Sequence, residues 1–229
     1  ISDLYEDDLH LQLKNGVNED SFTKLQTRLD TTDNGEYHPD KALLQKELDA
    51  AKVLFDDSEK LYDVTKVNTN ITAKKDGHLG FSGLNAWQPL GISASANEKI
   101  VVYVGGKGKK TGTNVNLQLV ATQQHAESNN LSQVVATLKT GRNEVTIPEL
   151  TSTDVERGGA LYVQYTGNNP QEELAVRVMG GTEIPVLNLY GVTDEKERTN
   201  KINAYMEEVK THTANLKSLH RKEKDFSFF

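Results

Sequence analysis

The spacing of apolar residues divides the chain into three parts. Before residue 65, apolar positions recur every three or four residues, which is typical of helices with one buried face. Between residues 65 and 190, short apolar runs alternate with polar residues and are separated by Gly, Asn and Pro, as in strands and turns. After residue 190 one apolar stripe continues at helical spacing. We therefore expect a helical segment over 1–64, a β domain over 65–190 and a long helix over 191–229.

The first part predicts two helices. A short one begins at Asp20-Ser21, where a polar side chain can cap the first turn. The clearer one runs over 40–55, and its apolar residues share one face: Leu43, Leu44, Leu48, Ala51 and Leu54. We expect the polar residues of this part, including the acidic pair Asp56-Asp57, to face water.

The middle part predicts short strands that follow one another closely. The clearest lie at 99–104, 115–121, 134–138, 144–147, 160–166, 173–179 and 185–190. No helix-length pattern interrupts them, which argues against a parallel sheet. The predicted fold class is α+β and mainly β. It consists of an antiparallel, jelly-roll-like β-sandwich, preceded by a small helical layer and followed by a long amphipathic helix.

One stretch, residues 179–191, joins the β domain to the last helix. Its structural motif comprises Gly180, Gly181, Thr182, Ile184 and Pro185. Paired glycines permit a bulge or a close approach of two backbones, and proline is confined to an edge strand or to the start of a strand. A helix start at Asp194, with Glu197 three residues on, then resembles a capping box. We therefore expect this stretch to end the sandwich.

Composition limits the classes of partner. The net charge is −7, and residues 1–64 hold sixteen acidic residues against seven basic ones. Nucleic acid is an unsuitable partner because binding it requires a clustered basic surface. No apolar run approaches the roughly 18–20 residues that cross a bilayer, so no membrane insertion is expected. The chain has no cysteine, which excludes thiol nucleophiles and thiolate metal sites within it.

The sequence contains no recognisable catalytic motif. The glycine- and lysine-rich stretch 105–112 lacks the spacing of a phosphate-binding loop, and a strand rather than a helix is expected after it. Six histidines are present, but no H-E-x-x-H pair of zinc ligands occurs. No Gly-x-Ser-x-Gly nucleophile elbow occurs either. We predict no catalytic residue and no metal ligand in this chain.

Trp87 is the one candidate for ligand binding. It is the single tryptophan, and it is flanked by Asn85 and Gln88. An exposed aromatic ring on a β-sandwich can stack on the face of a sugar ring. A lone tryptophan more often belongs to the core, and the sequence leaves both interpretations open.

Four segments, in order, resemble one known family. They are the stretch from Trp87 to Gly91 with the strand from Asn97 to Val104, the step at 141–148, the strand at 158–165, and the Gly180-to-Pro185 motif with Leu187 and Leu189. Together they resemble the enhancin-like zinc metallopeptidases of the gluzincin type. That family includes viral enhancins and secreted bacterial proteases that act on mucins and other O-glycosylated proteins. The acidic residues 1–64 resemble the extension that precedes these motifs in bacterial members.

The chain departs from the family pattern at two points. The family's Thr-Gly-Leu-Tyr is replaced here by Pro89-Leu-Gly-Ile92, and the zinc-binding H-E-x-x-H is absent. In the family that motif follows the β domain and further helices. The resemblance therefore implies an N-terminal, non-catalytic part of a secreted or cell-surface metallopeptidase. It implies no cofactor in this fragment and zinc in the full-length protein.

The resemblance also implies partners. They are the protein's own downstream catalytic domain and a glycoprotein or glycan substrate. Two alternatives remain open. One is a free-standing carbohydrate-binding β-sandwich of a bacterial surface or secreted protein, and the other is a purely structural or adhesive module.

Overall fold

A computed structural model describes residues 1–6, 10–64, 71–73, 79–81, 87–107, 117–122, 133–149, 159–165, 173–187 and 192–226. The helical elements are η1 (Ser2–Leu4), α1 (Glu19–Asp30), α2 (Lys41–Asp57), η2 (Ser58–Lys60) and α3 (Glu195–Phe226). The strands are β1 (Tyr62–Asp63), β2 (Ile71–Ala73), β3 (Leu79–Phe81), β4 (Trp87–Ala94), β5 (Lys99–Lys107), β6 (Leu117–Thr122), β7 (Gln133–Leu138), β8 (Gly141–Thr146), β9 (Gly159–Tyr165), β10 (Glu173–Met179) and β11 (Thr182–Glu183).

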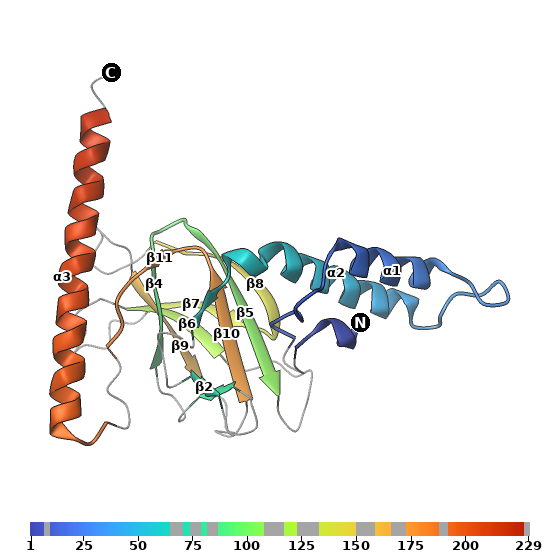
Figure 1. The fold of residues 1–229 in the computed structure, drawn as a ribbon, viewed down its shortest axis with the longest axis horizontal. Helices are drawn as coiled ribbons and strands as arrows, with labels where there is room; N and C mark the ends of the chain where they lie inside the picture. The colour runs from blue at the N-terminus through green and yellow to red at the C-terminus, as the bar shows by residue number, and fades with distance from the viewer. Residues whose placement is uncertain are drawn as a thin grey trace.

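Two antiparallel sheets form the centre of the molecule, between the helical parts (Figure 1). One has the strand order β1-β10-β5-β8, and the other has the order β11-β4-β9-β6-β7. A small third sheet pairs β2 with β3. The prediction of an α+β fold with antiparallel sheets is confirmed. The jelly-roll-like connection of the strands remains a prediction.

The two larger sheets share one hydrophobic core. Its buried residues are Val64, Leu90, Ile92, Ala94, Ile100, Val102, Val104, Leu138, Val145, Ile147, Leu161, Val163, Val176 and Val178. They come from strands of both sheets and alternate along β5 and β10, as the period of two requires for strands with one face inward. Burial of these side chains is the main force that holds the sheets together.

The first sheet is buried on its second face as well. Along β5 the side chains of residues 100–104 are all buried, although they alternate between the two faces of the sheet. Val101 and Tyr103 lie on the face opposite to the shared core. These two side chains belong to a second core, together with the apolar faces of α1 and α2 and the N-terminal loop. The N-terminal loop and the C-terminal end of α2 therefore pack against the outer face of this sheet.

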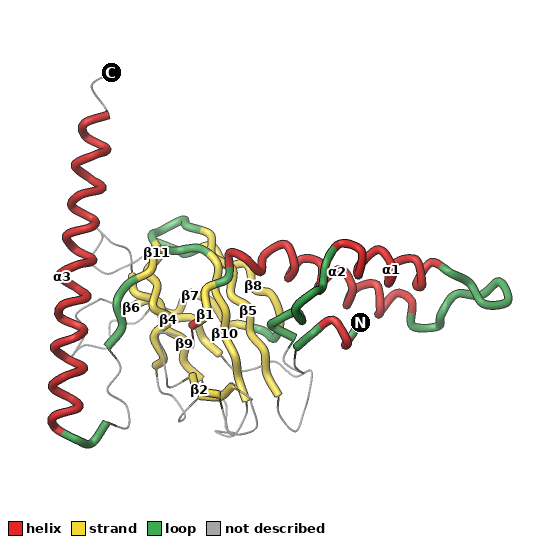
Figure 2. The backbone as a smooth tube through the Cα atoms, in the orientation of Figure 1, coloured by secondary structure: helices red, strands yellow, loops and turns green. Residues whose placement is uncertain are grey.

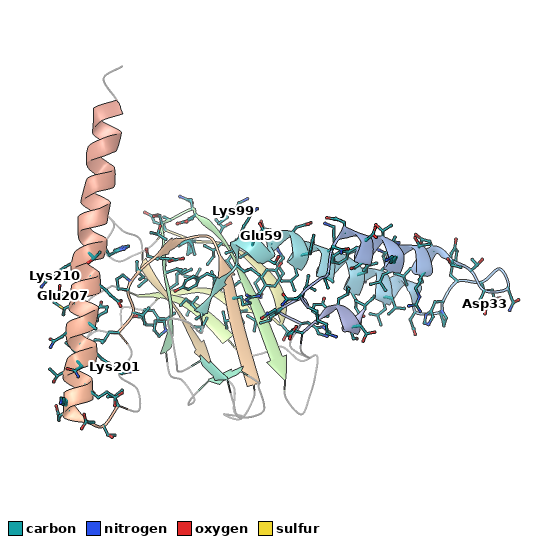
Figure 3. All side chains as sticks on the ribbon, in the orientation of Figure 1. Asp33, Glu59, Lys99, Lys201, Glu207 and Lys210 are labelled. Atoms are coloured by element: carbon teal, nitrogen blue, oxygen red, sulfur yellow. The ribbon has the colours of Figure 1, made fainter. Side chains whose placement is uncertain are left out.

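The α1–α2 hairpin projects from the sheets as a separate arm (Figure 2). Asn18 is the N-cap of α1. Its side chain accepts from the Ser21 N–H at 3.2 Å, and its own N–H donates to Ser21 Oγ at 3.2 Å. The predicted cap at Asp20-Ser21 is thus wrong by two residues. The helix predicted over 40–55 corresponds to α2. Asp33 lies near the tip of the arm, farthest from the sheets (Figure 3).

At the other side of the sheets, α3 runs as one long helix (Figure 1). Asp194 caps it by accepting from the Glu197 N–H at 2.7 Å, as the capping pattern predicts. Lys210 and Glu207 form an ion pair on this helix (Figure 3). Among the described residues, no helix is both long and apolar enough to cross a membrane. The predicted boundaries at 64/65 and 190/191 remain predictions.

Candidate functional site

The Gly180-Gly181 pair is where the chain passes from one sheet to the other. Strand β10 before it belongs to the four-stranded sheet, and β11 after it belongs to the five-stranded sheet. Both glycines have positive φ, +97° and +73°. Residues with a Cβ rarely adopt this conformation, so glycine suits the crossover.

Space is a second reason for glycine at the crossover. A Cβ atom at Gly181 would lie 2.8 Å from the carbonyl oxygen of Ser93, and one at Gly180 would lie 3.1 Å from that of Lys99. These two carbonyls flank the turn between β4 and β5. The crossover therefore lies directly against that turn, with no room for a side chain at Gly181.

Beyond the glycines, β11 is only two residues long. Thr182 and Glu183 pair with Ser93 and Ile92 at the edge of the sheet, and the Ile184 N–H donates to the Gly91 carbonyl at 2.8 Å. Pro185 follows outside the strand. The strand predicted over 185–190 is wrong for residues 185–187, which are irregular, and residues 188–190 lie outside the described residues. Proline has no N–H to continue the ladder, which fits the end of pairing before Pro185.

A cleft of about 380 Å³ lies between this segment and α3. Its lining comprises Tyr62, Glu183, Ile184, Pro185, Val186, Glu208 and His212. Two carboxylates, an imidazole and a phenol are among the lining groups, so the cleft suits polar or cationic groups better than anions. Among the described residues no group of histidines and carboxylates is arranged to hold a metal ion.

The structure gives only the backbone position of Trp87. It begins β4 and pairs with Gln164 of β9. Its side chain lies outside the part that the structure describes, so both interpretations of this residue remain predictions. The Gly180-to-Pro185 motif lies at the opposite end of β4, and its Thr182 and Glu183 pair with Ser93 and Ile92. The structure therefore does not bring Trp87 and this motif together through strand pairing.

The burial of one polar group was not predicted from the sequence. Asp57, expected to face water, is only 9% exposed at the base of α2. Its Oδ2 accepts from the Tyr103 hydroxyl at 2.6 Å and from Arg142 Nε at 3.1 Å. The error arises because α2 ends against the sheet, so a position that is polar along the arm becomes buried at its base.

This Asp57 cluster also changes the titration of Tyr103. Burial, followed by the hydrogen bond to Asp57, raises the pKa of the Tyr103 phenol well above its usual value of 10. The cluster joins three elements, α2, β5 and β8, beneath the helical arm. Because its hydroxyl, carboxylate and guanidinium bind one another, we assign it to structure rather than to catalysis.

The comparisons with known proteins give the following. No protein-family model and no curated protein match the chain. Among solved structures, it is similar to the CBM32-1, CBM32-2 and M60 catalytic domains of ZmpB from Clostridium perfringens. The identity is 25%, the TM-score is 0.48, and the match covers 91% of this chain and 21% of that one.

Two further structures from the same organism are similar over 66% of this chain. The ZmpB metallopeptidase is 27% identical, with a TM-score of 0.37 and 30% of its chain covered. The M60 catalytic domain of ZmpC, in complex with the sialyl T antigen, is 25% identical, with a TM-score of 0.38 and 29% covered. The chain thus spans less than a third of each of these metallopeptidase structures.

Proposed function

We propose that this chain is the N-terminal, non-catalytic portion of a secreted or cell-surface zinc metallopeptidase of the enhancin-like type. The full-length enzyme would act on mucin-type or other O-glycosylated proteins. The portion seen here would support the catalytic domain and help to form the substrate cleft. The zinc ion and the catalytic base would belong to sequence that follows Phe229.

The observation that carries the proposal is the order of four family-like motifs along about 105 residues. Each motif alone is short, but together they cover strands of both sheets. The segment from Asn97 to Val104 runs into β5, the step at 141–148 contains β8, and the strand at 158–165 coincides with β9. The Gly180-Gly181 motif forms the crossover to β11. A shared set of core strands is what a common domain would require.

No metal-binding group is found among the described residues, but this absence does not by itself favour a supporting role. The α3 helix offers a further argument. Its Ile202 and Met206 are 37% and 50% exposed, although they lie on the apolar stripe of a 32-residue helix. A long amphipathic helix normally buries such a stripe against a partner surface. A downstream domain of the same protein would provide that surface.

The test compares this chain with the longer protein to which we propose that it belongs, including the sequence proposed to follow Phe229. We expect residues 1–229 alone to bind no stoichiometric zinc and to leave a mucin intact. The longer protein should contain an H-E-x-x-H motif, bind one zinc ion by elemental analysis, and cleave the same mucin. A longer protein that has neither zinc nor cleavage activity would contradict the proposal.

A further inference from the structure

The turn between β4 and β5 presents one carboxylate to the sheet crossover. Glu98 ends this turn, and its Oε2 accepts from the N–H of Ser95 at 2.8 Å. Its Oε1 accepts from the N–H of Gly181 at 3.1 Å. A single side chain thus connects the turn with the segment that leads to β11. Hydrogen bonds to an ionised acceptor are stronger than those between neutral groups.

The turn is itself held firmly in place. The Glu98 N–H donates to the Ser95 carbonyl at 3.1 Å. The Asn97 N–H donates to the Ile147 carbonyl at 2.7 Å, and the Ile147 N–H donates to the Glu98 carbonyl at 2.8 Å. Glu98 therefore projects from a backbone that is fixed from two directions. A side chain on such a base can determine where its partner lies.

The partner, in contrast, has few bonds of its own. Strand β11 is two residues long and lies at a sheet edge, where it pairs only with β4. Edge segments with few hydrogen bonds open most easily. The Glu98 bond to Gly181 comes at the first point where the chain reaches the second sheet.

The same segment faces α3 across the cleft. Residues 183–186 line one side of the cleft, and Glu208 and His212 of α3 line the other. Among the described side chains of α3, only Tyr205, Val209 and His212 are partly buried. The partly buried portion of the described helix thus coincides with the portion that lines the cleft.

We propose that Glu98 is a positioning residue that sets the direction in which the chain leaves the sheets and thereby fixes α3 against them. Its carboxylate acts through the Gly181 amide, which anchors β11 and the following wall of the cleft. This role does not depend on the proposed protease function, because it concerns only elements within residues 1–229.

Distance measurements between two spin labels test the proposal. The chain has no cysteine, so cysteines introduced at exposed Ala50 of α2 and Asn203 of α3 can be labelled without background. We expect a narrow distribution of distances in this labelled protein. Glu98→Ala should increase its width about twofold and speed hydrogen exchange at the Gly181 amide, since an untethered edge opens more often.

Two further variants make the result decisive. Glu98→Gln keeps the size of the side chain but one of its two acceptors becomes a donor, so it should give an intermediate width even if Glu98→Ala fails to fold. Glu36→Ala removes the same charge near the tip of the hairpin and should leave the distribution unchanged. A folded Glu98→Gln protein with the parent distribution would overturn the proposal. So would a parent protein whose distribution is already as broad as that of a freely moving helix.

Discussion

The α1–α2 hairpin and α3 are both amphipathic, both charged, and both lie outside the sheets, on opposite sides (Figure 1). They are attached in different ways. On α2, Leu48 and Leu54 are each 3% exposed, and their core continues into Val101 and Tyr103 of β5. On α3, Ile202 and Met206 of the corresponding stripe are 37% and 50% exposed, and Glu208 and His212 face the sheets across one cleft.

The polar interactions of the two regions show the same difference in attachment. The hairpin is joined to the sheet by the buried Asp57 cluster, and Arg177 of β10 donates to the Leu11 carbonyl at 2.9 Å. In the part of α3 that the structure describes, the side-chain hydrogen bonds link residues of the same helix. An apolar stripe thus identifies a helix that needs a partner but does not say whether that partner lies in the same chain. For the hairpin, that partner is the outer face of the four-stranded sheet.

The largest expected effect comes from truncating one apolar side chain in each region. Leu54→Ala should lower the free energy of unfolding by about 3 kcal/mol, because it leaves a cavity in a packed core. Met206→Ala should change it by less than about 0.5 kcal/mol, because the side chain is half exposed and both residues favour helices. Urea unfolding followed by circular dichroism measures both. Equal losses in the two variants would mean that α3 is as much a part of the folded unit as the hairpin.

Much of this comparison could be predicted from the sequence, because it depends on local periodicity. Strand β10 has the bounds predicted for it, 173–179, since this mostly apolar run contains no Gly, Pro or Asn before Gly180 ends it. The helix of 40–55 was found in the same way. Strand β4 was not predicted, because Pro89 and Gly91 resemble turn residues. Pro89 is tolerated since β11 pairs only with Ile92 and Ser93, so Pro89 lies where β4 is effectively an edge.

The features that the sequence did not predict depend on distant residues. The partners of Asp57 lie 46 and 85 positions away, at Tyr103 and Arg142, and no local pattern distinguishes Asp57 from Asp56. The Glu98 bond to Gly181 spans 83 positions. The glycine pair itself indicated the junction, because glycine adopts positive φ and allows a close backbone approach without steric cost. The carbonyl groups that the glycines approach could be identified only from the fold.

A smaller effect is expected from the two neighbouring aspartates at the base of α2. Asp57→Ala should lower the free energy of unfolding by about 2 kcal/mol, because the Tyr103 hydroxyl loses its acceptor in a buried site. Asp56→Ala serves as the matched control, since its carboxylate is 56% exposed and pairs with Lys52 on the same helix. It should have no measurable effect. If both variants unfold alike, the Asp57 cluster does not fasten the hairpin to the sheet.

The smallest expected effect depends on pH and isolates the hydroxyl of Tyr103. This residue is neutral when protonated, and its pKa is raised in the folded protein, first by burial and then by Asp57. The folded state therefore holds the proton more tightly than the unfolded chain, where tyrosine titrates near 10. The resulting stabilisation is complete below about pH 10 and is lost as the pH rises above it.

Tyr103→Phe removes this contribution. At pH 8 the variant should be less stable than the parent by about 1 kcal/mol, the usual value for one lost hydrogen bond. The difference should shrink as the pH is raised to about 11, because only the parent then loses the contribution of this phenol. Urea unfolding at a series of pH values measures it, with Tyr37→Phe as the control at a 55% exposed ring. A difference that stays constant with pH would show that the Tyr103 hydroxyl does not help to attach the hairpin through Asp57. The contrast with α3 would then rest on apolar packing and on the bonds of Arg142 and Arg177.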